Sequence, residues 1–403
     1  MKYITSVDQF EDWLVKLMHV GENYLYMVKN KCINFLLLFL FIGVSAFSQQ
    51  GEDLKLKLGG AIRFNYNLSD WKDEQVKRGG DFGYDVFRLN ASGSYKKIGF
   101  NAEYRFYSKG FGGGMLKQGW MEYNINEGSK VQVGLQQVPF GLQPYTANSF
   151  FFNLPYYLGL EDDHDMGIKW VKTLEKLEIQ AAFYKNAEEL SFGNTSSLSP
   201  DRYAYDVSGR NKEVNQGNAK VSYKWGDQAQ SSLEFSAMYG GLYNVVTQKM
   251  GDHSALAVGY RYNGSKWGVK LQAIAFNKNP NDSSQYKDVI EMAAYGAPYN
   301  VAAKGQVITS SVSYKIPIKG DLVDQLLLYN DFSWFRKSNA DFNDSYMNVL
   351  GCLISAGPIY TYVDSAWGKN HSWLGPEWTN AFAEGASDAD WHMRFNINIG
   401  YYF

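Results

Sequence analysis

Four carboxylates lie within five residues at one point of the chain, at Glu161, Asp162, Asp163 and Asp165, with His164 between them. Carboxylate oxygens at this density can line a passage for ions or bind a hard divalent cation, and they can also simply keep a loop in water. Three interpretations are therefore open for this acidic cluster. It is the charged lining of a constriction, a solvated acidic rim, or a divalent cation site against lipopolysaccharide.

Four arginines supply charge of the opposite sign from polar positions of alternating segments. They are Arg63, Arg88, Arg105 and Arg394. If the first and last of these segments are neighbours, the arginines form one basic wall at similar depth. A row of charge in a narrow pore sets ion preference, so a pore-lining wall of this kind can select solutes. The alternative is that the arginines pair with Glu103 and Glu122 and only brace the structure.

Nucleophilic and acid–base chemistry has little support in the sequence. The histidines after residue 48 are His164, His253, His371 and His392. Only His164 lies among carboxylates, and no G-x-S-x-G motif accompanies it. The glycines at 112–114 open no helical segment, so they do not indicate a nucleotide phosphate loop. We therefore predict that the protein is not an enzyme and needs no cofactor and no metal.

The charged residues are carried by strands that have one apolar face. Residues 391–403 read WHMRFNINIGYYF, in which every second side chain is apolar or aromatic. Successive side chains of a strand point to opposite faces, so this segment shows one face to oil and the other to water. Residues 54–68, 86–95 and 98–107 repeat the pattern. The alternation is typical of a transmembrane β-barrel.

The same reading predicts about sixteen strands, an even number that suits a bacterial barrel. Beyond those above, they lie near 117–126, 129–137, 166–173, 177–185, 217–226, 231–243, 253–263, 266–277, 304–316, 325–336, 346–354, 358–368 and 389–403. Connections after strands 2, 4, 6, 8, 10 and 14 are short and the 317–324 turn is intermediate, whereas those after odd-numbered strands are mostly long. The longest are 69–82, 138–165, 186–216, 278–303 and 369–388. This sorting favours an antiparallel barrel with short periplasmic turns and long outer loops over a secreted β-sandwich.

Composition agrees with an all-β membrane protein. The chain has 403 residues, 16% aromatic side chains, 39 glycines and 9 prolines. A mean hydropathy of −0.35 excludes a bundle of transmembrane helices, but barrels escape this measure because only alternate residues meet lipid. The net charge of −2 gives no reason to expect a nucleic-acid partner.

The first 48 residues predict export rather than structure. Lys29 and Lys31 precede a short apolar run at 33–42, and Ala46-Phe47-Ser48 follows it. This is the pattern of a secretory signal peptide, which we place at 27–48 with cleavage after Ser48. Residues 1–26 are then an upstream extension that does not belong to the native protein, with a soluble amphipathic extension as the alternative. Residues 49–403 form the barrel domain.

Residues 134–141, Gly-Leu-Gln-Gln-Val-Pro-Phe-Gly, resemble the hallmark of the phosphate-selective porin O and P family. Residues 116–123 and 357–370 resemble further patterns of that family. Within the hallmark, Gly134, Pro139, Phe140 and Gly141 are the marked positions. Pro139 cannot donate to a ladder and ends the strand, and Gly141 permits a sharp turn.

The resemblance implies a sixteen-stranded, trimeric outer-membrane barrel whose phosphate preference depends on an arginine row and on lysines near the constriction. In general porins the third outer loop folds into the lumen, and we expect 138–165 to do so here. The acidic cluster in that loop departs from the family, so a general porin for small polar or anionic solutes fits as well as a phosphate channel. Phe403 then serves as the signal for the barrel assembly machinery.

The sequence therefore predicts a passive porin in the bacterial outer membrane. Its expected partners are membrane lipid, the assembly machinery, small polar or anionic solutes and two further copies in a homotrimer. The alternative is a non-conducting barrel that acts as a surface adhesin or receptor. Long aromatic outer loops such as 186–216 and 369–388 would serve that role.

Overall fold

A computed structural model describes residues 54–188 and 202–403. The predicted signal peptide and upstream extension lie outside the described residues. None of the helices in the described part is both long and apolar enough to cross a membrane.

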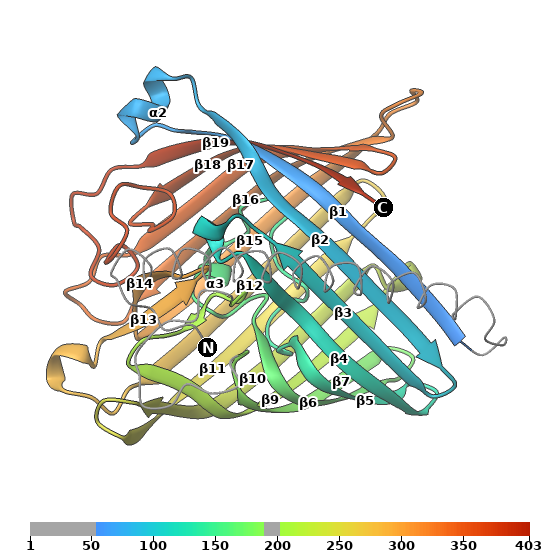
Figure 1. Ribbon diagram of the computed structural model, residues 1–403, viewed down its shortest axis with the longest axis horizontal. Helices are drawn as coiled ribbons and strands as arrows, with labels where there is room; N and C mark the ends of the chain where they lie inside the picture. Colours follow the sequence, from blue (N-terminus) through green and yellow to red (C-terminus); the bar gives the residue numbers. More distant parts are fainter. Residues whose placement is uncertain (1–53, 189–201) are drawn as a thin grey trace, which may run out of the picture. The chain divides into compact units, whose positions relative to one another are not determined.

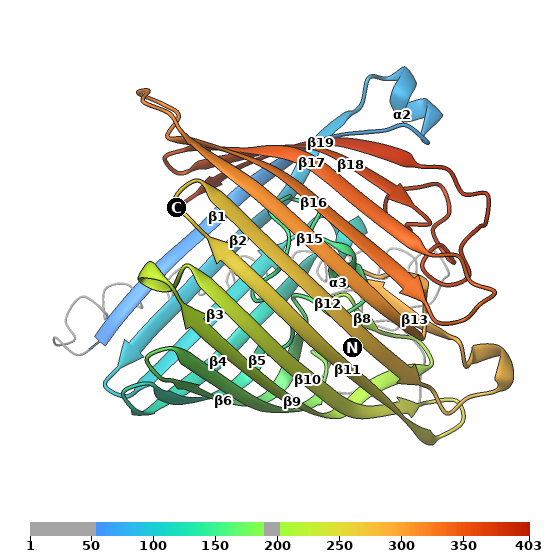
Figure 2. The same ribbon diagram turned by 180° about the vertical axis from the view of Figure 1, so that it is seen from behind.

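The described residues form one closed antiparallel barrel of sixteen strands, which confirms the predicted fold class (Figures 1 and 2). The barrel strands are β1 (Leu54–Ser69), β2 (Asp81–Tyr95), β3 (Ile98–Phe106), β4 (Gly114–Asn126), β5 (Ser129–Gln137), β6 (His164–Thr173), β7 (Leu177–Asn186), β9 (Asn211–Trp225), β10 (Ser231–Asn244), β11 (Lys249–Asn263), β12 (Trp267–Asn279), β15 (Lys304–Pro317), β16 (Gln325–Lys337), β17 (Ser345–Ala356), β18 (Ile359–Lys369) and β19 (His392–Tyr402).

The barrel closes where the first and last strands pair. β1 and β19 run antiparallel, with Ala61 opposite Tyr402. Phe403 continues the ladder, because its carbonyl accepts from Gly60 N at 2.8 Å and its N–H donates to Gly60 O at 3.1 Å. The Phe403 ring stacks on Phe87 with centroids 6.5 Å apart. Closure leaves no unpaired strand edge, which a strand in lipid requires.

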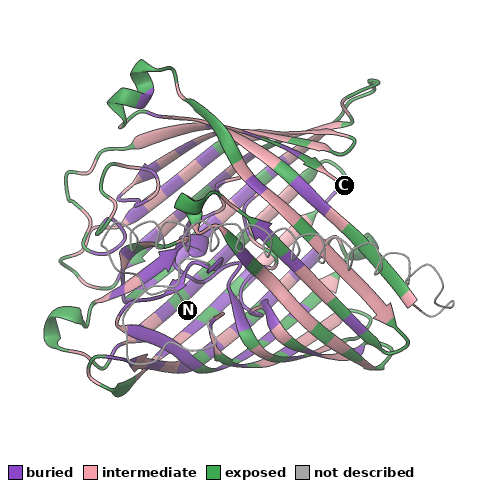
Figure 3. Ribbon diagram, viewed as in Figure 1, coloured by how far each residue is buried: buried purple, intermediate pink, exposed green. Residues whose placement is uncertain are grey.

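Buried and exposed residues alternate along the barrel strands (Figure 3), and the polarity of the two faces is the reverse of that in a soluble protein. Large apolar side chains such as Leu256 and Leu350 are 64% and 57% exposed on the outer wall. Asp331, Ser333 and Asn396 are fully buried on the inner side. This arrangement follows directly from the alternation in the sequence, since lipid takes the apolar face and the interior takes the polar one.

Loop lengths are sorted between the two ends of the barrel as predicted, with two departures. The turn between β15 and β16, residues 318–324, is as long as the connections between β3 and β4 and between β16 and β17. The connection between β10 and β11 belongs to the long-loop end but spans only residues 245–248. The long loops also contain a small sheet that the sequence did not predict. It has the order β14 (Ala297–Ala302), β13 (Val289–Ala294) and β8 (Asp206–Val207).

Within residues 54–188 and 202–403, helical structure is confined to connections. A helix, α2 (Asp73–Lys77), lies in the loop after β1, and single 3-10 turns occupy Lys109–Phe111, Asp227–Ala229 and Ser284–Tyr286. The loop after β5, residues 138–163, folds into the barrel as predicted and is called the inner loop below. It contains α3 (Leu154–Tyr157), which packs against β15 and β16.

Candidate functional site

The hallmark residues span the second half of β5 and the turn into the inner loop, with Gly134 inside the strand. Gly134 has φ 135°, and a Cβ there would lie 2.3 Å from the carbonyl oxygen of Gly119. Gly141 has φ 59°, and a Cβ there would lie 2.6 Å from Oε1 of Gln272. Only glycine fits both the conformation and the space at these two positions. Pro139 follows the end of β5, and Phe140 is buried beside it.

The first half of the inner loop is held by four basic side chains, one each from β6, β9, β11 and β12. Each donates to a main-chain carbonyl at the start of the loop. The contacts are Lys169 Nζ to Gln137 O (2.9 Å), Lys220 Nζ to Gly141 O (2.7 Å), Arg261 Nη2 to Gln143 O (2.6 Å) and Lys270 Nζ to Ala147 O (2.8 Å). A carbonyl is a neutral acceptor, so these contacts fix the loop without neutralising the cations.

These four basic anchors were missed by the sequence reasoning. Their positions on the polar faces of their strands were visible, but nothing in the sequence indicates which carbonyl each would meet. Lys220 also forms an ion pair with Glu234 at 2.8 Å. Lys169 and Lys270 form no ion pair with any residue that the structure describes.

The middle of the inner loop is held through its N–H groups. Asp331 Oδ2 accepts from Asn148 N at 2.8 Å and from Ser149 N at 2.7 Å. Asp364 Oδ2 accepts from Phe150 N at 3.0 Å. The wall thus supplies donors to the loop carbonyls on one side and acceptors to the loop N–H groups on the other. These hydrogen bonds satisfy backbone N–H and C=O groups of the inner loop, which lies away from bulk water.

The four predicted arginines lie on the interior face, where each contacts a polar or acidic side chain. Arg63 Nε is 2.9 Å from Asp85, and its guanidinium lies 5.7 Å from the Phe150 ring of the inner loop. Arg394 donates to Asn67 at 2.9 Å and lies 5.6 Å from the Phe151 ring. Two arginine cations therefore meet the aromatic tip of the loop.

Arg88 and Arg105 share one acid. Arg105 Nη2 is 2.6 Å from Glu103 Oε1, and Arg88 Nη1 is 3.9 Å from the same oxygen. The sequence left open that the arginines pair with Glu103 and Glu122. Glu103 does pair with arginines, whereas Glu122 pairs with Lys130 at 3.0 Å.

The expected common depth of the arginines is wrong for Arg394. Arg63 lies opposite Gly400 in the β1–β19 ladder, whereas Arg394 lies opposite Ser69. The two residues are six positions apart along the strand direction, or about 20 Å at roughly 3.3 Å per residue. Counting residues from the strand ends could not determine the depth of Arg394 relative to Arg63. That depth depends on the stagger between the first and last strands, which is a property of the closed barrel.

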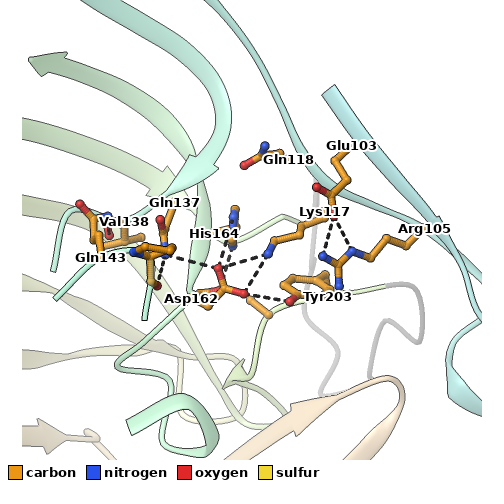
Figure 4. Close-up of polar contacts among 12 residues, drawn as sticks. Glu103, Arg105, Lys117, Gln118, Gln137, Val138, Gln143, Asp162, His164 and Tyr203 are labelled. Atoms are coloured by element: carbon orange, nitrogen blue, oxygen red, sulfur yellow. Dashed lines mark hydrogen bonds and ion pairs between the residues drawn. The ribbon is translucent and has the colours of Figure 1, made fainter. Parts of the chain in front are cut away.

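Asp162 is the centre of a buried network at the end of the inner loop (Figure 4). Its Oδ2 is 2.9 Å from Lys117 Nζ and accepts from the Tyr203 hydroxyl at 2.8 Å. Gln137 donates to Oδ1 at 3.3 Å. Two cations also lie over the Tyr203 ring, the Arg105 guanidinium at 4.7 Å and the Lys117 ammonium at 4.6 Å from the ring centroid. These contacts join the arginine side of the barrel to the inner loop.

The acidic cluster does not form one exposed patch. Its four carboxylates are all buried, between 1% and 6% exposed, and enter three different environments. Glu161 accepts from the Thr146 hydroxyl at 2.7 Å within the inner loop, and Asp162 pairs with Lys117. Asp163 and Asp165 point to a third place, beside Glu213 of β9. Burial raises the pKa of Glu161 to about 8 despite the hydrogen bond from Thr146.

Comparison with known proteins gives a likeness in structure only. No protein-family model and no curated protein matches the chain. An anion-selective porin from Comamonas acidovorans superposes with a TM-score of 0.57 at 13% identity, over 87% of this chain and all of that one. The outer membrane channel DcaP of Acinetobacter baumannii gives 0.55 at 13% identity, over 88% and 99%. OmpF of Salmonella typhi, in complex with daunomycin, gives 0.57 at 12%, over 87% and 98%.

These structures define the class of fold to which the chain belongs. It has the closed sixteen-stranded barrel of outer-membrane porins, with an inner loop after the fifth strand. The likeness at these identities concerns the fold and leaves the solute to the chemistry of this chain's own residues.

Proposed function

We propose that this protein is an outer-membrane porin, a water-filled channel for the passive diffusion of small polar or anionic solutes. The proposal rests on the way the inner loop is held: side chains of the barrel wall bind both its carbonyl groups and its N–H groups. Lys220 holds a loop carbonyl at 2.7 Å, and Asp331 holds a loop N–H at 2.7 Å. A loop fixed in this way narrows the lumen by a constant amount, as a size-selective channel requires.

Ionised side chains inside the short-turn end of the barrel support a watery interior. Lys224 and Glu178 form a pair at 3.4 Å, and their side chains are 41% and 24% exposed on the inner face. Lys130 and Glu122 form a similar pair with 36% and 18% exposure. Charged groups remain this accessible inside a barrel only where water reaches them.

The balance of accessible charge favours anions over cations. Arg88 and Arg105 have one acid between them, and Lys169 and Lys270 form no ion pair with a described residue, whereas Lys220 and Arg261 share Glu234. The carboxylates of the acidic cluster are buried in local contacts instead. Phosphate is one candidate solute, on the strength of the hallmark resemblance at 134–141, but the proposal requires only a small anion or polar molecule.

The setting of the channel is part of the same proposal. Export depends on the signal peptide at 27–48, and Phe403 is the residue that the barrel assembly machinery reads. The protein functions in outer-membrane lipid as a homotrimer, in keeping with the family resemblance and with the trimer form of OmpT of Vibrio cholerae, which has a TM-score of 0.51 to this chain at 13% identity. The channel needs no catalytic group and no cofactor.

Liposome swelling tests the proposal. Liposomes containing the folded barrel should swell in solutions of a pentose or of a small organic anion, and protein-free liposomes should not. Swelling should be faster with the anion than with a cation of equal size. Absence of swelling with every solute, from protein that is folded and inserted, would overturn the proposal.

Aromatic side chains from three long loops pack together into an aromatic cap. This cap favours a second candidate function, that of a surface receptor or adhesin. Tyr156 and Tyr157 of the inner loop contact Tyr205, which in turn lies 5.4 Å from Trp373. This cap joins three long loops into one ordered outer surface, as recognition of a partner requires. A folded barrel without flux would support this candidate.

A further inference from the structure

Three carboxylates from separate parts of the chain converge inside the barrel. Asp163 ends the inner loop, Asp165 belongs to β6 and Glu213 belongs to β9. One oxygen from each lies within 4.8 Å of the others, and all three residues are buried. This acid triad is separate from the Asp162 network, because neither Asp163 nor Asp165 shares a contact with Lys117.

The surroundings of the acid triad hold too few cations to neutralise it. The buried Asp206 and the partly buried Glu188 add two further acids. Among the described residues, the balancing cations are Lys278, whose Nζ is 2.6 Å from Glu213, and Arg202, which lies 3.9 Å from Asp206 and 3.8 Å from Glu188. Five carboxylates thus face two basic groups, which leaves an excess of three negative charges when all are ionised.

Such an excess is costly in a buried place, so it must be met by protons or by a metal ion.

Unused oxygen atoms distinguish a metal site from a simple cluster of acids. Asp163 Oδ1, Asp165 Oδ1 and Asp206 Oδ2 have no hydrogen-bond partner among the described residues, although the residues are only 6%, 1% and 2% exposed. Gln216 adds a neutral donor atom, since its Oε1 is also buried and unpartnered while its Nε2 lies 3.4 Å from Asp165. Rotation of that amide exchanges its oxygen and nitrogen. Buried polar atoms without partners call for a ligand.

We propose that Asp163, Asp165 and Glu213 bind one divalent cation, Ca²⁺, that ties the end of the inner loop to β6 and β9. The ligand set is carboxylate and amide oxygen, which suits a hard cation. Ca²⁺ tolerates the irregular geometry of ligands drawn from separate segments better than Mg²⁺, which demands an octahedron. His253 Nδ1 lies 3.8 Å from Glu213 Oε1, beyond hydrogen-bond distance.

Binding of the metal to the full-length protein tests this proposal without reference to transport. The detergent-solubilised barrel is stripped with a chelator and titrated with CaCl₂ by isothermal calorimetry. One site is expected, and Asp163→Asn and Glu213→Gln should each weaken it more than about tenfold. Glu127→Gln, in the exposed turn between β4 and β5, is the matched control and should bind like the unchanged protein.

Thermal unfolding of the unchanged protein supplies a second readout that needs no variant. The melting temperature should fall on chelation, rise again with CaCl₂, and respond less to MgCl₂ at the same concentration. Absence of calcium binding would overturn the proposal, as would equal responses to the two metals. A melting temperature that is indifferent to chelation, combined with an Asp163→Asn variant more stable than the parent, would show that protons alone neutralise the triad.

Discussion

Arg88 and Arg105 stand directly opposite one another on β2 and β3, and both turn to the same oxygen of Glu103. One carboxylate cannot neutralise two guanidinium groups, so this part of the inner wall keeps a positive charge. Arg63 differs, since Asp85 is its own partner at 2.9 Å. The wall is therefore less uniform than four arginines in a row: Arg63 has an acid of its own, Arg88 and Arg105 share one, and Arg394 donates to the neutral Asn67.

Replacing Arg88 should shift ion selectivity toward cations. The Arg88 side chain is 22% exposed, so Arg88→Gln removes charge at little structural cost. A unit charge at close range in water is worth about 1 kcal/mol, which corresponds to at most roughly a fivefold change in the permeability ratio. Reversal potentials in a salt gradient measure this change. Lys97→Gln, in the turn between β2 and β3, is the control; equal potentials for both variants would mean that the shared-acid site does not filter ions.

Releasing the N–H side of the inner loop should make the channel noisy. Asp331→Ala removes the acceptor of Asn148 N and Ser149 N and leaves two buried donors unpaired. The expected loss of stability is about 3 kcal/mol. Single-channel recordings should show larger current fluctuations, and thermal unfolding should begin earlier. Asp321→Ala, on an exposed turn, should change neither, and quiet recordings from Asp331→Ala would mean that the basic anchors suffice.

Breaking one side of the Asp162 network should cost more than removing both. Lys117→Met leaves Asp162 buried beside Tyr203 without its cation, which should destabilise the barrel by about 3 kcal/mol. Adding Asp162→Asn should recover part of that loss. A double-mutant cycle on the free energy of unfolding measures the coupling. Additive losses would show that the 2.9 Å pair contributes no interaction energy.

Stability should fall as pH rises through the neutral range. Burial raises the pKa of Glu161 to about 8, so the folded protein holds a proton that the unfolded chain releases near pH 4 to 5. The stabilisation is complete below the unfolded value and is lost as pH approaches 8. The loss from this residue is on the order of 5 kcal/mol.

Melting temperatures measured in chelator from pH 5 to pH 9 test this dependence. Glu161→Gln should flatten the slope without abolishing it, because burial also raises the pKa of Glu188 to about 8 and that of Asp206 to about 6. Parallel curves for the variant and its parent would contradict a neutral Glu161.

The strands could be predicted because each carries its own evidence, an apolar face every second residue, and Phe403 closes the barrel where that pattern ends. The importance of the hallmark could be predicted as well, since Gly134 and Gly141 have backbone conformations that few other residues adopt. The partners of the acidic cluster could not be predicted from the sequence. Adjacent residues Asp162 and Asp163 diverge because the backbone turns at Asp162, with φ 55°, and sends them to different partners. Lys117 and Glu213 lie on strands that only the closed barrel brings to that turn.

Single-channel recording in planar lipid bilayers tests the central claim most directly. The folded protein, added to one side of the bilayer, should produce discrete conductance steps, with three levels per insertion event if it is a trimer. In a salt gradient the reversal potential should show preference for anions. Protein that inserts and remains folded but gives no steps would contradict the claim that the inner loop narrows an open channel, and would leave the barrel as a surface receptor.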